Sequence, residues 1–254
     1  MTARRTPTDH FSVVSAGYAA YRPRYPLALF EAVVPLAPRR RLAWDCAAGS
    51  GQATIDLANW FDHVIATDMS LSQISSAPEH PKVTWYVAKA EQSKIASDTV
   101  DFIAVAQALH WFDQAAFFAE ARRVAAPDGI LAVWSYGSIE IDGELGRAVS
   151  HFEHDSLGQY WPAERNYVNE LYATIRFPFD EIRVPPVQME EHWTQQQLLG
   201  YMRTWSARSR YMATNGKDPV DEFEHDVAKL WRDADTPRTM RWPLTIRVGR
   251  VTKH

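Results

Sequence analysis

The chain has 254 residues, of which 46% are hydrophobic and 23% charged, with a formal net charge of −4. This length and composition suit one globular domain with a sizeable core and exclude a disordered or fibrous chain. The acidic balance argues against a nucleic-acid-binding protein, which would present a basic face. No apolar run reaches the roughly 18 residues of a membrane-spanning helix, and no signal peptide is recognisable. A single cysteine, Cys46, excludes an internal disulfide and a multi-cysteine metal site, so we expect a cytoplasmic protein.

The first part of the chain is rich in aromatic residues and prolines. Residues 1–25 contain DHFSVVSAGYAAYRPRYP, which lacks a strand pattern and must pack on something, so we expect this segment to act as a lid. The stretch 27–36 has apolar residues at helical spacing and is ended by Pro38.

From Pro38 to about residue 138, short apolar runs alternate with helical patterns. The runs are RLAWDC, HVIATD, VTWYVA, VDFIAVAQA and ILAVWSY, and the helical stretches are 52–60, 70–77 and 114–126. Such alternation predicts a parallel sheet with helices on both faces, in which buried strands are nearly continuously apolar.

After residue 140 the pattern changes. A polar helical stretch covers 142–173, and FDEIRVPPVQMEEHWT then alternates, although its two prolines allow only an edge strand or a bulge. QLLGYMRTWSARSRYM and VDEFEHDVAKLWRDA predict two helices, and TMRWPLTIRVGRV predicts one final strand. We therefore expect a single domain over 1–254, with a lid at 1–25, a core at 26–140, a cap at 141–236 and the last strand at 237–250.

The stretch DCAAGSGQAT follows the first predicted strand and has the composition of a ligand-binding turn. Gly49 and Gly51 can adopt positive φ and expose backbone N–H groups. The helix that begins near Gln52 directs its positive dipole end into the same space. Asp68 ends the next strand, where a carboxylate can accept hydrogen bonds from both hydroxyls of a ribose.

Two cofactors fit this framework. A dinucleotide loop needs a third glycine, where this chain has Thr54, and Asp45 before the turn would oppose a pyrophosphate. A carboxylate there instead suits a cofactor with a cationic ammonium or sulfonium group. The residues therefore favour S-adenosylmethionine over NAD.

DCAAGSGQAT, VIATDMSLSQI, VAKAEQ, VDFIAVAQALHWFD and EARRVAAPDGILAVWSYG resemble, in order and spacing, the motifs of class I S-adenosylmethionine-dependent methyltransferases. The lead-in, HWFD, GYMRTWSA and RWPLTIRVGR look like the methyltransferase-11-type subgroup that includes trans-aconitate methyltransferases. The resemblance covers nearly the whole chain. It implies a Rossmann-like α/β fold with a seven-stranded sheet, mostly parallel with its last strand antiparallel, helices on both faces and a helical cap.

The resemblance also implies the cofactor contacts. Asp45 and the glycines would line the methionine part, Asp68 would take the ribose hydroxyls, and Arg22 would pair with the cofactor carboxylate. The full expected cofactor set is Arg22, Asp45, Ala47, Gly49, Gly51, Gln52, Asp68, Met69, Gln73, Ala90, Glu91, Gln107 and Ala108. Within it, Met69 would pack on the adenine, Ala90 and Glu91 would lie at its edge, and Gln107 and Ala108 would flank the sulfonium.

Two residues depart from the family pattern. Ala47 replaces the usual first glycine; its methyl group is tolerable if φ is negative, and we expect at most weaker cofactor binding. Lys89 stands where many relatives carry the acid that reads the adenine amino group, so adenine must be held by backbone or by Glu91. These departures leave open a cofactor-binding protein without catalysis.

The methyl acceptor is less well defined. His110, just after the fourth predicted strand, is a candidate general base for a hydroxyl or amine, and the alternative is that His110 and Trp111 only shape the pocket. A carboxylate would need no base. We expect O-methylation of a carboxylate or hydroxyl on a small molecule; N- or S-methylation of a heterocycle or thiol is the alternative. An Asn-Pro-Pro-aromatic motif of nucleic-acid amino methylases is absent, since the chain has QALHWF.

The cap is expected to supply specificity. Helical spacing places Tyr201, Trp205 and Arg208 on one face, which suits a planar or anionic substrate; a core stripe with its arginines in solvent is the alternative. The substrate-binding set is Tyr18, Tyr21, Trp111, Tyr136, Tyr201, Trp205 and Arg208. The histidines of HFEH at 151–154 have no surrounding ligand set, so we expect no metal. The sequence does not determine the oligomeric state.

Overall fold

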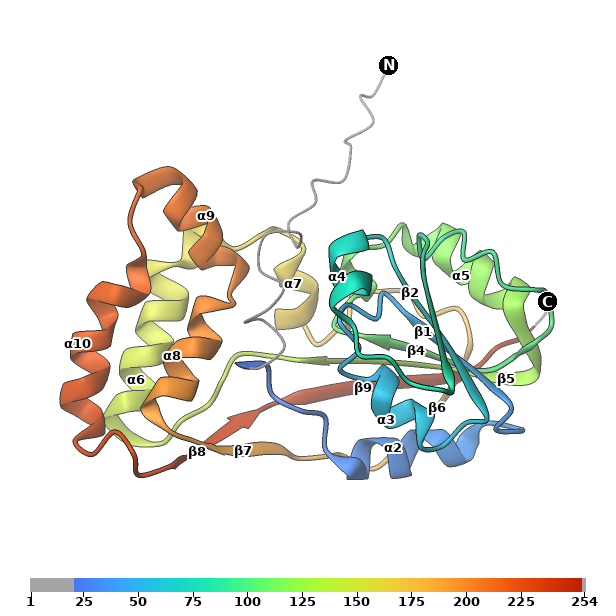
Figure 1. Cartoon of the computed structure of the whole chain (residues 1–254), viewed down its shortest axis with the longest axis horizontal. Coiled ribbons are helices and arrows are strands. Elements are labelled where there is room, and N and C mark those ends of the chain that lie inside the picture. Colours follow the sequence, from blue (N-terminus) through green and yellow to red (C-terminus); the bar gives the residue numbers. More distant parts are fainter. Residues whose placement is uncertain (1–20, 253–254) are drawn as a thin grey trace, which may run out of the picture.

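The computed structural model describes residues 21–252. Tyr18 and most of the expected lid segment lie outside this range. Within it, the chain forms a sheet flanked by helices on the right of Figure 1 and a helical cap on the left. No helix of the described range is long and apolar enough to cross a membrane.

Seven strands form the main sheet, in the order β3-β2-β1-β4-β5-β9-β6. The strands are β1 (Leu42–Cys46), β2 (His63–Asp68), β3 (Val83–Val87), β4 (Val100–Ala106), β5 (Ala125–Tyr136), β6 (Asp180–Ile182) and β9 (Leu244–Arg250). The pairs among β1 to β5 are parallel, and β9 is antiparallel to both β5 and β6. The predicted fold, mostly parallel with an antiparallel last strand, is confirmed.

Helices cover both faces of this sheet. They are α2 (Leu27–Val33), the 3-10 turns η1 (Val34–Leu36) and η2 (Leu109–Trp111), α3 (Thr54–Ala58), α4 (Leu71–Ser76) and α5 (Gln114–Val124). Phe30 of α2 and Trp134 belong to one buried cluster, while Phe117 of α5 and Trp44 belong to another. Two cores separated by one sheet are the physical reason for the nearly continuous apolar strands β4 and β5.

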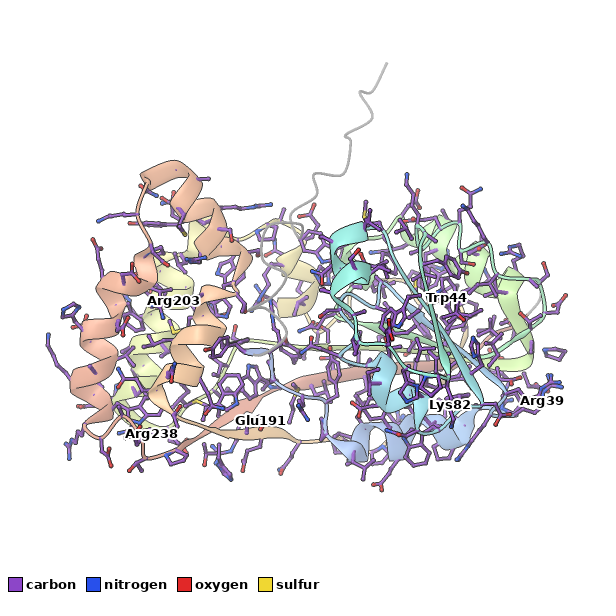
Figure 2. The ribbon with its side chains drawn as sticks, viewed as in Figure 1. Arg39, Trp44, Lys82, Glu191, Arg203 and Arg238 are labelled. Carbon is purple, nitrogen blue, oxygen red and sulfur yellow. The ribbon has the colours of Figure 1, made fainter. Side chains whose placement is uncertain are left out.

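The cap is built from the later helices. These are α6 (Gly143–His151), the π-helical η3 (Phe152–Ser156), η4 (Gly158–Tyr160), α8 (Gln195–Arg203), α9 (Ser206–Asn215) and α10 (Pro219–Trp231), while α7 (Arg165–Asn169) lies between cap and sheet in Figure 1. Arg203, labelled in Figure 2, joins α8 to α10 through ion pairs with Asp221 and Glu224 at 3.0 and 2.9 Å. The range 141–236, expected as a cap, also supplies β6 to the main sheet.

Two predicted elements are each divided in the structure. TMRWPLTIRVGRV forms β8 (Arg238–Trp242), which pairs with β7 (Met189–Trp193) in a separate two-stranded sheet, and then β9 in the main sheet. Pro243, which has no N–H to donate to a ladder, lies between β8 and β9. The helix predicted over QLLGYMRTWSARSRYM ends at Arg203, and α9 begins after Trp205, which has an extended backbone.

Candidate functional site

The turn after β1 carries three residues in the left-handed region. Ala47, Gly49 and Gly51 have φ of 58°, 56° and 99°. We expected Ala47 to be tolerated if its φ were negative, and this condition is not met. The left-handed backbone conformation costs a residue with a Cβ about 1–2 kcal/mol. The backbone of the turn is therefore strained at Ala47, where the family pattern described above has a glycine.

Gly51 has a packing role. A Cβ at this position would lie 2.6 Å from Cη2 of Trp85 and 3.3 Å from its Cζ2. The turn therefore passes directly against an indole ring of β3, and only a glycine fits there.

Asp68 ties the turn to the end of β2. Its Oδ2 accepts a hydrogen bond from the backbone N–H of Gly49 at 2.9 Å, and its Oδ1 accepts one from the N–H of Ser70 at 2.8 Å. Because β1 and β2 are parallel neighbours, their carboxyl ends bring this carboxylate beside the glycine turn, as the sequence predicted.

Asp45 is fully buried at the end of β1. Its Oδ2 accepts a hydrogen bond from the Thr54 hydroxyl at 2.5 Å, while Oδ1 has no hydrogen-bond partner within residues 21–252. Burial raises the pKa of Asp45 to about 7, against the effect of the Thr54 hydrogen bond, and the nearby Asp68 raises it further. A buried carboxylate with one unsatisfied oxygen favours a cationic or hydrogen-bond-donating ligand.

A cavity of about 140 Å³ adjoins this turn, and we call it the loop pocket. It is lined by Arg22, Tyr25, Asp45, Ala47, Ala48, Gly49, Ser50, Gln52, Ala53, Asp68, Gln73, Ala106, Gln107, Ala108, Trp111 and Tyr136. Nine residues of the expected cofactor set are among them. Tyr25 also lines this pocket but is not in the expected cofactor set, because nothing in the tripeptide RYP marks its tyrosine as a ligand-binding residue.

Four residues of the expected cofactor set do not line the loop pocket. They are Gly51, Met69, Ala90 and Glu91. Met69 follows β2 and is 53% exposed, Ala90 is buried, and Glu91 accepts a hydrogen bond from the backbone N–H of Asp113 at 3.0 Å. The Glu91 carboxylate therefore has a structural partner, the residue that caps α5.

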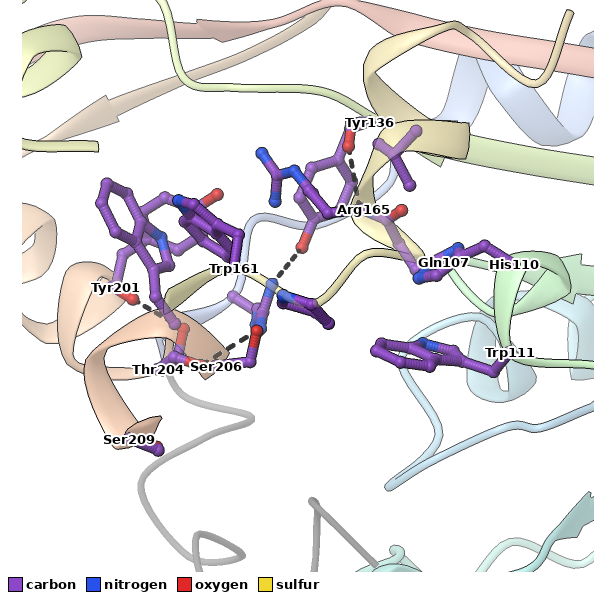
Figure 3. A pocket seen from close by; sticks show the side chains of 14 residues that line it. Gln107, His110, Trp111, Tyr136, Trp161, Arg165, Tyr201, Thr204, Ser206 and Ser209 are labelled. Atoms are coloured by element: carbon purple, nitrogen blue, oxygen red, sulfur yellow. Dashed lines mark hydrogen bonds between the residues drawn. The ribbon is translucent and has the colours of Figure 1, made fainter. Parts of the chain in front are cut away.

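A second cavity, of about 120 Å³, lies toward the cap, and we call it the cap pocket (Figure 3). It is lined by Arg22, Gln107, His110, Trp111, Tyr136, Trp161, Pro162, Arg165, Val168, Tyr201, Thr204, Trp205, Ser206 and Ser209. Four residues, Arg22, Gln107, Trp111 and Tyr136, line both cavities. We call these four the junction, because the two cavities meet at them.

The junction side chains are held by hydrogen bonds. Arg22 donates from Nη1 to the Tyr136 hydroxyl at 3.0 Å. Gln107 has a φ of 54° and donates from Nε2 to the Tyr136 carbonyl at 3.1 Å, while its Oε1 accepts from the Ser135 hydroxyl at 2.5 Å. A strained backbone with a fixed amide is a feature often found at functional sites.

His110 lines the cap pocket but is not suited to act as a base. Its Nδ1 forms a hydrogen bond with the Tyr172 hydroxyl at 2.7 Å, and its ring lies 4.8 Å from that of Trp111. Burial lowers the pKa of His110 to about 3, and the charge of Arg165 lowers it further. A base with so low a pKa accepts a proton poorly at neutral pH, which favours the alternative that His110 shapes the pocket. Tyr172, which holds it, was not predicted.

Arg208, expected to contact the substrate, lies outside the cap pocket in the structure. Its guanidinium is paired with both oxygens of Asp218, the residue that caps α10, and it does not line the cap pocket. Tyr201 and Trp205 do line it. The helical spacing that grouped the three residues fails because the chain breaks between α8 and α9.

Arg165 was missed by the sequence analysis. It begins α7 and lines the cap pocket next to Trp161. No motif in WPAERNY distinguishes this arginine from a surface one, so only the tertiary structure identifies it.

Tyr21, expected in the substrate set, packs against Gly200 of α8. A Cβ added to Gly200 would lie 2.3 Å from Cδ1 of Tyr21. Tyr21 lines neither the loop pocket nor the cap pocket.

The comparisons with known proteins agree with this geometry. A family model described as a methyltransferase domain matches residues 44–133. A candidate type II methyltransferase of known structure from Anaeromyxobacter dehalogenans is 42% identical, with a TM-score of 0.84 over 92% of this chain and 99% of that one.

Two relatives match nearly the whole chain in sequence. A candidate methyltransferase from Dictyostelium discoideum is 32% identical over 91% of this chain and 90% of its own length. A protein from Saccharomyces cerevisiae, named as a candidate S-adenosylmethionine-dependent methyltransferase, is 30% identical over 90% of this chain and 92% of its own. With the sheet order and the glycine turn, these matches show that the chain belongs to the class I S-adenosylmethionine-dependent methyltransferases.

Proposed function

We propose that this enzyme transfers the methyl group of S-adenosylmethionine to an oxygen of a small carboxylic acid. In this proposal the loop pocket holds the cofactor and the cap pocket holds the acceptor. The adjacency of the two cavities supports it, because Arg22, Gln107, Trp111 and Tyr136 line both. An acceptor in one cavity thus lies beside a cofactor in the other.

The residues of the loop pocket fit the cofactor. The buried and unsatisfied Oδ1 of Asp45 would accept a hydrogen bond from the ammonium group of the methionine part. Asp68 would bind the ribose hydroxyls. Met69, which is exposed and lies outside the loop pocket lining, would pack on the adenine. Arg22 would pair with the cofactor carboxylate. When bound, S-adenosylmethionine supplies a methyl group attached to a sulfonium, which is electrophilic.

One observation carries the choice of a carboxylate. His110, the candidate base, has a pKa of about 3. The other titratable side chains that line the cap pocket are arginines and tyrosines, which do not accept protons at neutral pH. An acceptor hydroxyl or ammonium group would have to lose a proton, whereas a carboxylate is already ionised and nucleophilic.

The chain's own contribution is then alignment. The Gln107 amide and the Tyr136 hydroxyl are fixed at the junction by hydrogen bonds, and the Trp111 ring packs beside His110. Positioning of two reactants can supply roughly 7–11 kcal/mol of a barrier without any proton transfer. Aromatic walls also exclude water that would compete with the acceptor.

The test is an acceptor screen with the enzyme and methyl-labelled S-adenosylmethionine. The panel contains small carboxylic acids, phenols and heterocyclic amines, and each labelled product is then treated with alkali. We expect labelled acids to release labelled methanol, because methyl esters are hydrolysed in alkali whereas methyl ethers and N-methyl groups are not. Transfer only to phenols or amines, with alkali-stable products, would contradict the proposal.

A further inference from the structure

We propose that Arg165 binds an anionic group of the methyl acceptor, and that Glu153 and Trp161 position its guanidinium. This inference rests on the proposed methyl transfer to a small molecule. It assigns the specificity for charged acceptors to a residue at the start of α7, in place of the Arg208 that helical spacing suggests.

The hydrogen bonds of Arg165 leave the two N–H groups of its Nη1 available. Nη2 donates to Oε1 of Glu153 at 2.9 Å and to the Ser138 hydroxyl at 3.3 Å, and Nε donates to Oδ1 of Asn169 at 3.2 Å. A guanidinium has five N–H donors, and within residues 21–252 no partner is found for the two on Nη1. These two donors belong to a side chain that lines the cap pocket.

The guanidinium is held in one orientation. Its centre lies 4.4 Å from the ring centroid of Trp161, which supports one of its faces. The Glu153 side chain, which pairs with Nη2, is only 3% exposed. A stacked arginine with a buried carboxylate beside it loses little further freedom when it binds an anion, which then accepts a hydrogen bond from Nη1. Figure 3 shows Arg165 between Tyr136 and Trp161.

The charges around the cap pocket also favour an anion. Arg22 and Arg165 line it, and no acidic side chain of the described chain does. Glu153 neutralises part of the charge of Arg165, but Glu153 does not itself line the cap pocket. An acceptor anion in this half-enclosed space meets two guanidinium groups in an environment of lower dielectric than water, where such hydrogen bonds are strong.

Arg165 differs from Arg22 in its position. Arg22 lines both cavities, donates to Tyr136 and lies 5.8 Å from the ring centroid of Tyr201. Arg165 lines only the cap pocket. Arg22 is therefore placed to serve cofactor and acceptor together, and Arg165 contacts the acceptor alone. Trp161 and Trp205 provide the apolar wall around this site, so the acceptor class is a small acid with a planar or apolar body.

The experiment is calorimetric titration of the enzyme saturated with S-adenosylhomocysteine. The probes are benzoate, phenylacetate, cinnamate and sorbate, each paired with its neutral amide. Wild-type enzyme should bind at least one acid tenfold or more tightly than its amide. Arg165→Gln should weaken that acid tenfold or more and its amide less than twofold. Arg208→Gln is the matched control, a cap arginine outside the pocket, and should leave both affinities unchanged.

Two further variants separate charge from positioning. Arg165→Lys keeps the charge but loses the planar guanidinium that stacks on Trp161, and should weaken the acid less than Arg165→Gln does. Glu153→Gln keeps the shape of the buried partner but replaces the ion pair with a weaker hydrogen bond. The guanidinium is then held less firmly, and this variant should weaken the acid threefold to tenfold with the amide unaffected, although the pocket becomes more positive. Equal losses for acid and amide in both variants would mean that Arg165 and Glu153 only hold the fold.

The outcomes distinguish this inference from the proposed function. If no acid binds more tightly than its amide, or if Arg208→Gln lowers acid binding as much as Arg165→Gln, the role of Arg165 is overturned. If acids bind through Arg165 but the labelled products are alkali-stable phenol ethers or N-methyl compounds, the anion site stands and the carboxylate as the reacting group is overturned. The titrations are repeated without S-adenosylhomocysteine, so that a failure of this ligand to bind cannot hide the result.

Discussion

At the scale of single residues, Ala47 combines a functional position with backbone strain. Its φ of 58° lies in the left-handed region, yet it lines the loop pocket. Glycine enters this region without steric cost but loses more backbone entropy on folding. We expect Ala47→Gly to raise the free energy of unfolding by about 0.5–1 kcal/mol, measured by urea denaturation.

The neighbouring Ala48 provides the control for that prediction. It is not among the described residues with positive φ, so Ala48→Gly should destabilise the enzyme by about 0.5–1 kcal/mol through the same entropy term. If both substitutions destabilise equally, the turn does not store strain at Ala47.

At the scale of elements, helix α8 places Gly200 against Tyr21. In an exposed helix interior, replacing glycine with alanine stabilises by about 1 kcal/mol. Here the added Cβ would lie 2.3–2.6 Å from Cδ1, Cε1 and Cγ of Tyr21, so the methyl group must displace the ring. We expect Gly200→Ala to lower the free energy of unfolding by about 1–2 kcal/mol, measured by urea denaturation.

A double-mutant cycle checks the cause. In the background of Tyr21→Ala, the same Gly200→Ala change should become neutral or stabilising, because the space is no longer occupied. A loss of stability that persists without the tyrosine ring would place the conflict elsewhere in α8 and would remove the proposed contact between this helix and the start of the described chain.

At the scale of the whole molecule, two buried groups link stability to pH with opposite signs. The pKa of Asp45 is raised from its ordinary value of 3.8 to about 7, so the folded state holds a proton that the unfolded state releases between these values. Its contribution to stability is present below pH 3.8 and is lost as the pH rises to 7. The pKa of His110 is lowered from 6.5 to about 3, so its contribution is present above pH 6.5 and is lost as the pH falls to 3.

Single variants should separate the two effects. Relative to wild type, Asp45→Asn should gain unfolding free energy as the pH rises from 5 to 7, by about 1 kcal/mol per pH unit. His110→Gln should gain relative to wild type as the pH falls from 6 to 4. Urea denaturation at several pH values measures both slopes. If the Asp45→Asn curve runs parallel to that of wild type, Asp45 is ionised throughout and the burial argument fails.

The sequence by itself determined the sheet and the glycine turn beside which we propose that the cofactor binds. Apolar runs alternating with helical patterns predict parallel strands, because a strand buried on both faces must be apolar throughout. The carboxyl ends of β1 and β2 follow from that pattern, and with them the closeness of Asp45, Gly49 and Asp68. Each of these residues lies at the end of a predicted strand or in the turn after it, so the strand pattern was enough to predict that they lie together.

Only the tertiary structure decided which residues line the cap pocket. Arg165, Trp161 and Tyr201 come from separate elements that meet across the cap pocket, and no spacing along the chain predicts such a meeting. Helical periodicity selected Arg208 because it assumes one continuous helix, whereas the break at Trp205 turns that arginine toward Asp218. The pKa values of Asp45 and His110 likewise depend on burial by residues distant in sequence. Local patterns fix elements and their ends, and burial and side-chain convergence are fixed by packing between them.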